Sequence, residues 1–185
     1  MPLFLETNDV AIVEMRFQST LVLAFSALAV SGHVIKRDGE SVLHAIHALD
    51  FALDKQSKAV LEFPNIPYSK LDEAGDATQD KLKELLDVVT ETHPIGRLES
   101  DKIAEALEAQ VPIIKSTAEG VIARHHQFSF EDKKHVGETI REDRKLTRKI
   151  NEILGPKLNL SRPEHAVKVS EEIDALFAQA EAKFS

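Results

Sequence analysis

The sequence predicts an all-α fold, an antiparallel bundle of about five amphipathic helices preceded by one short, strongly apolar helix. From residue 38 onward, apolar residues recur with the 3.6-residue period of a helix. Proline or glycine interrupts this pattern at short intervals, as it does between helices. No segment shows a convincing two-residue alternation typical of a strand.

The most apolar segment, LVLAFSALAV at residues 21–30, lies in a chain with 29% charged residues. Ten residues suit the apolar part of a secretory signal peptide better than a membrane span, which needs about 20. Met15 and Arg16 supply the basic start of such a signal, and small residues follow it. We therefore predict a signal peptide with a dibasic site over residues 15–37. A buried core helix and a membrane anchor are the alternatives.

Residues 1–14 carry three acids and no base, which is the wrong charge for the start of a signal peptide. We interpret them as an upstream extension, with initiation at Met15 instead of Met1. Residues 38–185 then form one helical-bundle domain of ordinary size.

Composition excludes several classes of function. The net charge of -8, without a stripe of Lys and Arg, argues against a nucleic-acid partner. The absence of cysteine excludes disulfides, zinc-thiolate sites and thiol catalysis. With no Trp and a single Tyr, the core must consist mostly of Leu, Ile, Val and Ala.

The first two helices of the domain are separated by the sequence PNIPY. The first should begin after an N-cap at Ser41. Its apolar stripe is formed by Val42, Ile46, Leu49, Leu53 and Val60. The second should begin near Asp76, or already at Ser69, and end before Pro94. Its stripe is formed by Leu82, Leu85, Leu86 and Val89.

Three longer runs follow. The third helix should begin near Glu99 and bend at Pro112. Its stripe is Ile103, Leu107, Val111, Ile114, Ala118, Val121 and Ile122.

The fourth helix has a heavily charged centre, REDRK, and should end at Gly155. Its stripe is Val136, Ile140, Leu146, Ile150, Ile153 and Leu154. The fifth should begin with a capping box of Ser161 and Glu164. Its stripe is Ala166, Val169, Ile173, Leu176, Phe177, Ala180 and Phe184.

Four features of the sequence together carry a family resemblance. They are the signal segment, the Lys36-Arg37 pair, the cysteine-free and Ala-rich helical domain, and the closing IDALFAQAEAKFS. Over residues 15–185 the chain resembles the fungal hydrophobic surface-binding protein A family, which includes cell-wall galactomannoprotein antigens. The resemblance implies a secreted or wall-associated bundle that adsorbs to hydrophobic surfaces. In the antigen branch it implies a long-chain fatty acid held in a central apolar cavity. It also implies processing after Lys36 and Arg37, leaving a mature start at Asp38.

Apolar stripes that face one another can leave an elongated dry cavity where small alanine side chains fail to fill the space. An acyl chain entering it gains about 0.8 kcal/mol per buried methylene. Without a disulfide, the bundle could also open and spread its stripes on a hydrophobic surface. From periodicity alone, the candidate lipid-binding residues are Ile46, Leu49, Leu53, Leu86, Val89, Leu107, Val111, Ile114, Ile150, Ile173 and Phe177.

Evidence for a catalytic or metal site is weak, and we expect a non-catalytic protein that needs no cofactor. His44, His47 and Asp50 have helical spacing, but one helix supplies only part of a metal's coordination shell. We interpret them as a solvated face, with a metal-dependent enzyme as the alternative. No GxSxG, GxGxxG or P-loop sequence occurs.

Two further expectations concern modification and partners. Asn159 begins an N-glycosylation sequon, which only a secreted chain could use. The rival to a lipid binder is an adaptor, a solid bundle that recruits another secreted protein, such as a hydrolase, to a hydrophobic surface.

Overall fold

Five long α-helices account for most of residues 35–185, the part of the chain that this computed structural model describes. They are α2 (Ile35–Glu62), α3 (Tyr68–Glu91), α4 (Arg97–Ala123), α5 (Phe130–Leu154) and α6 (Pro163–Lys183). Two 3-10 turns, η1 (His125–Gln127) and η2 (Gly155–Lys157), join α4 to α5 and begin the connection to α6. The prediction of an all-α bundle is confirmed.

The upstream extension and almost all of the predicted signal segment lie outside the described residues. Residues 35–37, which include the predicted processing pair Lys36 and Arg37, fall within them, in the first turn of α2. No helix of residues 35–185 combines the length and the apolar character that crossing a membrane requires.

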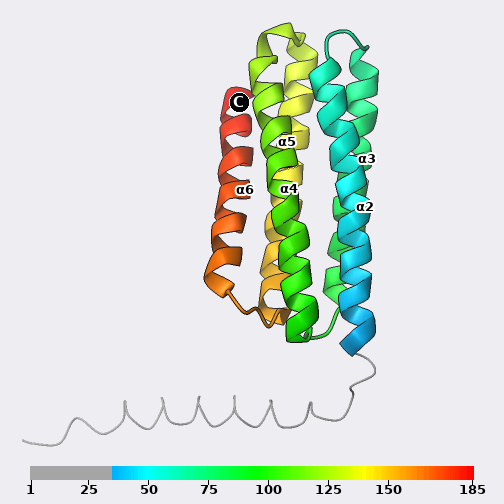
Figure 1. Cartoon of the computed structure of the whole chain (residues 1–185). Helices are drawn as coiled ribbons and strands as arrows, with labels where there is room; N and C mark the ends of the chain where they lie inside the picture. The colour runs from blue at the N-terminus through cyan, green and yellow to red at the C-terminus, as the bar shows by residue number, and fades with distance from the viewer. Residues whose placement is uncertain (1–34) are drawn as a thin grey trace, which may run out of the picture. The chain divides into compact units, whose positions relative to one another are not determined.

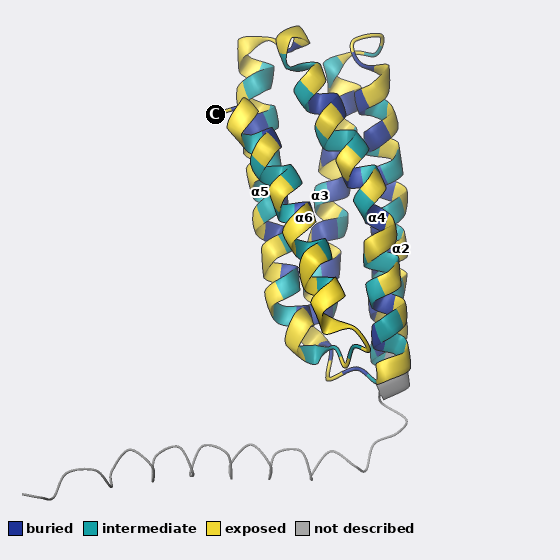
Figure 2. Ribbon diagram, turned by 60° about the vertical axis from the view of Figure 1, so that its left-hand side comes forward, coloured by how far each residue is buried: buried dark blue, intermediate teal, exposed yellow. Residues whose placement is uncertain are grey.

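The five helices form a closed ring. Successive helices run in opposite directions along the bundle (Figure 1). Their principal packing partners, however, do not follow the chain order: α2 packs on α3 and α4, α3 on α5, α5 on α6, and α6 on α4. Buried residues face the inside of this ring and exposed residues the outside (Figure 2).

A ring of five helices has more space at its centre than a ring of four. With neighbouring axes 8–10 Å apart, each helix axis lies roughly 8 Å from the centre of a five-membered ring, against roughly 6 Å for four. The side chains must fill this additional width or leave a cavity.

The buried residues form two apolar clusters. The larger extends across all five helices and includes Val42, Ile46, Leu85, Ile103 and Leu154. The smaller is rich in aromatic side chains and contains Val60, Phe63, Leu71, Val121, Phe128 and Phe184. Leu, Ile and Val make up most of the two clusters, as the composition predicted, but the remaining buried members are Phe and not the predicted Ala.

Two predicted helix starts are wrong. Helix α2 begins at Ile35, so Ser41 lies inside it. Within the additional turn before Ser41, the Asp38 carboxylate forms a tertiary contact by accepting a hydrogen bond from the backbone nitrogen of His93 at 3.3 Å. Ser161 does not cap α6, whose N-cap is Arg162. Its hydroxyl instead donates to Asp101 on α4 at 2.5 Å.

Other helix boundaries agree better with the expectations. Helix α3 begins at Tyr68, next to the earlier of the two predicted starts. Helix α4 continues through Pro112 without interruption. Helix α5 has a capping box formed by Ser129 and Asp132, a feature that the sequence analysis overlooked.

Candidate functional site

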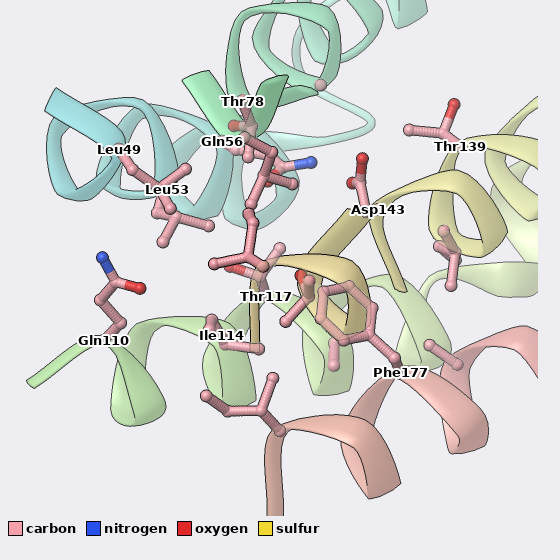
Figure 3. A pocket seen from close by; sticks show the side chains of 18 of the residues that line it. Leu49, Leu53, Gln56, Thr78, Gln110, Ile114, Thr117, Thr139, Asp143 and Phe177 are labelled. Atoms are coloured by element: carbon pink, nitrogen blue, oxygen red, sulfur yellow. The ribbon is translucent and has the colours of Figure 1, made fainter. Parts of the chain in front are cut away.

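A cavity of about 170 Å³ lies inside the ring, and all five helices contribute to its wall. Most of the wall is apolar, with leucine, isoleucine and valine side chains facing inward (Figure 3). Small residues widen it at several levels, namely Gly75, Ala104, Ala118, Ala166 and Ala180. The five-membered ring thus leaves space that its side chains do not fill.

Seven of the eleven residues predicted to bind lipid line this cavity, and four do not. Those at the wall are Leu49, Leu53, Leu107, Ile114, Ile150, Ile173 and Phe177. Ile46 and Val89 are fully buried in the packed core away from the cavity. Leu86 and Val111 are partly buried against that core. Lipid contact by any of these residues stays a prediction.

Aromatic side chains close one end of the cavity. Phe128, in the connection between α4 and α5, stacks on Phe63 with ring centroids 4.6 Å apart. Tyr68 and Phe184 meet the Phe128 ring edge-on, at 6.2 and 5.8 Å. Tyr68 and Phe128 also line the cavity. Burial raises the pKa of Tyr68, and the negative charge of the nearby Asp72 carboxylate raises it further. The Tyr68 hydroxyl therefore stays protonated at physiological pH.

The start of α6 contributes to another part of the cavity wall. Leu158, just before α6, and His165, in its first turn, both line the cavity. His165 pairs with Glu108 of α4, with Nε2 2.9 Å from Oε2, and both side chains are half exposed. This contact connects two neighbouring helices of the ring beside the cavity.

A polar cluster interrupts the apolar wall between α2, α3 and α5. It consists of Gln56, Thr78, Thr139 and Asp143 (Figure 3), all of which line the cavity. The Gln56 amide nitrogen and the Thr139 methyl group both lie beside Gly75, within 4 Å of where its Cβ would be. The amide of Gln56 points toward the Asp143 carboxyl group (Figure 3).

Asp143 is the buried charged group of this cluster, with only 5% of its surface exposed. Its Oδ1 accepts a hydrogen bond from Gln79 Nε2 at 3.4 Å, which is long for such a bond. Burial raises the pKa of Asp143 to about 7, an effect that the Gln79 hydrogen bond only partly opposes. The carboxyl group can therefore change charge near neutral pH.

The seam between α5 and α6 separates the cavity from the surface. Four side chains, Thr147, Asn151, Ser170 and Phe177, line both the cavity and a groove on the outside of this seam. Asn151 Nδ2 donates to Ser170 Oγ at 2.8 Å across it. A polar contact, together with one aromatic ring, therefore closes the cavity wall here.

The histidines considered as metal ligands do not form a site. His47 lies on the exposed side of α2, where its Nδ1 is 3.3 Å from Asp50. Asp50 also accepts a hydrogen bond of 2.6 Å from Gln110, a buried residue of α4. Within residues 35–185, no group of three or more His, Asp or Glu side chains is placed to hold a metal ion.

The sequence analysis overlooked the polar residues of the wall, although a signal for them was present. Gln56 follows Leu53 by three residues and precedes Val60 by four, so it lies on the apolar stripe of α2. Asp143 precedes Leu146 by three residues and Ile150 by seven in the same way. Polar residues at stripe positions indicate either a buried hydrogen bond or a cavity.

Comparison with known proteins shows the fold. No protein-family model matches the chain, and no curated protein matches it in sequence. The Aspergillus protein AfMP4p, solved in complex with palmitic acid, has a TM-score of 0.73 at 14% identity, covering 80% of this chain and 99% of its own.

Two domains of the Penicillium marneffei MP1 protein are also similar. Ligand-binding domain 2, complexed with multiple arachidonic acids, has a TM-score of 0.72 at 14% identity and covers 79% of this chain and 95% of its own. Ligand-binding domain 1, complexed with arachidonic acids, has a TM-score of 0.62 at 13% identity, with coverages of 83% and 97%. The chain therefore has the fold of these fungal ligand-binding domains.

Proposed function

We propose that this protein is a non-catalytic lipid carrier that holds a long-chain acyl lipid in the cavity at the centre of its helical ring. The observation that carries the proposal is an apolar cavity lined by all five helices. Solved structures of the same fold contain palmitic or arachidonic acid, which supports a fatty acid as the simplest ligand.

Binding a long acyl chain requires the ring to widen. A cavity of about 150 Å³ is filled by one benzene molecule. The cavity of about 170 Å³ is only slightly larger. We infer that the seam between α5 and α6 opens to admit the chain, because polar side chains form much of the wall there.

The place of action that we propose is outside the cell or in the cell wall. Residues 15–37 would act as the signal segment, with processing after Arg37. A relationship to the hydrophobic surface-binding protein A family, with adsorption to hydrophobic surfaces, belongs to the same proposal. The large exposed apolar side chains of residues 38–185 come from four different helices: Phe51, Leu61, Leu98, Phe130 and Val167.

Displacement of a fluorescent fatty acid, cis-parinaric acid, by palmitic acid tests the carrier function. We expect saturable binding by the full chain. Ala118 lines the cavity, so Ala118→Phe should weaken binding at least about tenfold by filling the space that the ligand needs. Ala109, on the exposed side of the same helix, is the matched control, and Ala109→Phe should bind normally.

Circular dichroism should show both variants folded. Ala166→Phe offers a second way to fill the cavity if Ala118→Phe does not fold. Binding that is equally strong in both cavity-filling variants would place the ligand elsewhere and reject the proposed site.

Secretion has a separate test. The protein released by a eukaryotic secretory host should begin at Asp38, as read by N-terminal sequencing, and an intact Met1 would contradict the proposed processing. The same sample reports on the sequon, because Asn159 is exposed and a glycan would add to its mass. Recruitment of a secreted hydrolase remains a separate prediction, and the cavity is not evidence for it.

A further inference from the structure

Asp143 occupies an unusual place for a carboxyl group. It lies near the midpoint of α5, its side chain is buried, and it forms part of the wall of an otherwise largely apolar cavity. A buried carboxylate is costly unless hydrogen-bond donors or cations surround it. The groups around Asp143 therefore indicate what the cavity requires from a ligand.

Within residues 38–185, no lysine or arginine forms an ion pair with Asp143. The charge of Lys83 on α3 lowers the Asp143 pKa, but its ammonium group contacts Gln79 Oε1 at 3.0 Å and Asp80 at 3.7 Å. Glu142 adds a like charge beside Asp143. The only hydrogen bond that Asp143 accepts in this range is the long one from Gln79.

Three further carboxylates on the helices packed against α5 already have partners. On α3, the cavity-lining Asp72 pairs with His135 at 2.8 Å. On α6, Asp174 and Glu181 are held by Arg144. None of these side chains supplies a donor to Asp143, so its carboxylate is under-compensated in the empty cavity.

Two polar side chains near Asp143 also lack a side-chain hydrogen-bond partner among the described residues. Gln56 and Thr139 line the cavity beside Asp143, and neither forms a side-chain hydrogen bond with another described residue. The amide of Gln56 can donate to an oxygen atom next to the carboxylate that accepts from it. Together, Asp143 and Gln56 match a hydroxyl group, which donates one hydrogen bond and accepts another.

We propose that the cavity selects long-chain lipids that carry an uncharged hydroxyl group, which donates to the Asp143 carboxylate and accepts from the Gln56 amide. This inference rests on the proposed lipid-carrier function and names the ligand class. At pH 8, where Asp143 is mostly ionised, it disfavours an ionised fatty-acid head group at this position, because two carboxylates in a buried site repel each other. Burial also raises the Asp143 pKa to about 7, as expected for a carboxyl group that lacks donors in the empty cavity.

The position of Asp143 leaves two sources for the hydroxyl group. A hydroxyl in the middle of an acyl chain would reach Asp143 with the chain extending both ways along the cavity. A terminal hydroxyl, as in a long-chain alcohol, would reach it with the chain filling one half. Both use the same chemistry at Asp143 and Gln56.

The test compares lipids that share an uncharged 18-carbon chain. Dissociation constants are measured by displacement of cis-parinaric acid from the full chain at pH 8. The ligands are methyl stearate, methyl 12-hydroxystearate and 1-octadecanol. We expect at least one of the hydroxylated lipids to bind about tenfold more tightly than methyl stearate, and the stronger of the two identifies where the hydroxyl lies.

Asp143→Leu is the decisive variant, because it removes the acceptor and keeps the branched shape of the side chain, although leucine is larger. It should bind methyl stearate at least as tightly as the unmodified protein does and lose the preference for a hydroxyl group. Asp87→Leu is the matched control, since Asp87 is an exposed carboxylate of α3 that does not line the cavity. It should retain the preference. If Asp143→Leu does not fold, Asp143→Asn, a weaker neutral acceptor, should show a reduced preference.

The outcomes separate the two proposals. If methyl stearate binds and neither hydroxylated lipid binds more tightly, the hydroxyl preference is wrong and the carrier function stands. A preference that persists unchanged in Asp143→Leu and Asp143→Asn also overturns it. If cis-parinaric acid does not bind to the protein, the carrier function fails and the preference fails with it.

Discussion

Arg144 of α5 holds Asp174 of α6 through two parallel hydrogen bonds, from Nε to Oδ1 and from Nη2 to Oδ2, both 2.9 Å long. Arg148 reaches the same carboxylate at 2.6 and 2.9 Å. Arg144 Nη1 also donates to Glu181 at 2.8 Å. These contacts form a network of charges along the seam through which we expect a lipid to enter.

Removing the shared acceptor should weaken this seam. Asp174→Asn removes the carboxylate that Arg144 and Arg148 share. The Arg144 side chain is only about one-fifth exposed. We expect the free energy of unfolding to fall by about 1–2 kcal/mol, a discounted value because Asp174 is itself one-third exposed. Urea unfolding measures the change.

An exposed ion pair within one helix provides the control for Asp174→Asn. Glu73 bonds Lys70 at 2.7 Å on the surface of α3. Solvent screens such a pair, so Glu73→Gln should leave the unfolding midpoint unchanged. Equal effects of the two substitutions would show that the network between α5 and α6 adds no stability.

The same substitution should speed ligand exchange. If the seam opens during binding, weakening its charge network lowers the barrier to release of a bound lipid. We expect Asp174→Asn to release cis-parinaric acid several-fold faster than the unmodified protein in stopped-flow measurements. An unchanged release rate in a variant with reduced stability would place the route elsewhere in the ring.

Stability should depend on pH through Asp143 in a defined direction. Its pKa is about 7 in the folded protein, above the ordinary value of 3.8. Between these values the native state binds more protons than the unfolded state, so stability falls as pH rises. The contribution is fully present below the ordinary pKa and is lost as pH passes through 7.

Asp143→Asn removes this dependence. The stability of the variant relative to the unmodified protein should increase between pH 4.5 and 7.5, by a few kcal/mol at most. Urea unfolding at several pH values measures the difference. A difference that stays constant over this range would mean that Asp143 ionises normally.

Gly120 allows α4 to approach α2 closely. A Cβ atom at this position would lie 2.7 Å from Val60 Cγ1, and Val60 is both buried and stiff. Gly120→Ala should therefore destabilise the protein by about 1–2 kcal/mol, even though alanine favours helix by about 1 kcal/mol. Thermal unfolding reports the loss.

Gly75 is the matched control for Gly120, because it also lies inside a helix. The nearest atom to its Cβ would be Gln56 Nε2, at an ordinary contact distance of 3.7 Å. Gly75→Ala should be neutral or raise stability by up to about 1 kcal/mol. If both variants were stabilised, close packing at Gly120 would not be limiting.

The helices themselves could be predicted because periodicity is a local property. The stripes of α2 to α6 appear in the order of the chain, and a 3.6-residue repeat of apolar residues forms a helix whatever its neighbours are. Helix starts were less predictable. Ser41 and Ser161 are good N-cap residue types, but the chain forms hydrogen bonds to Asp38 and Asp101 that only the assembled bundle provides.

The candidate site was predictable in part. A stripe identifies the side of a helix that faces inward, and this was sufficient to bring Leu53, Ile114 and Phe177 to the cavity wall. It does not distinguish a residue at the centre of the ring from one packed in the surrounding core, such as Ile46 or Val89. The charged centre REDRK illustrates the same limit, because its Asp143 faces the cavity while Arg144 binds α6.

The sequence by itself therefore determined the helices, their inward faces and a core without disulfides, because these depend on the spacing and type of residues along one chain. Only the tertiary structure decided that the helices close into a ring in the order α2, α3, α5, α6 and α4. That order sets the width of the centre, and it brings Gln56 and Asp143 from separate helices to one side of the cavity. The physical reason is that a cavity is the volume left by the packing of all five helices, a quantity that no single helix contains.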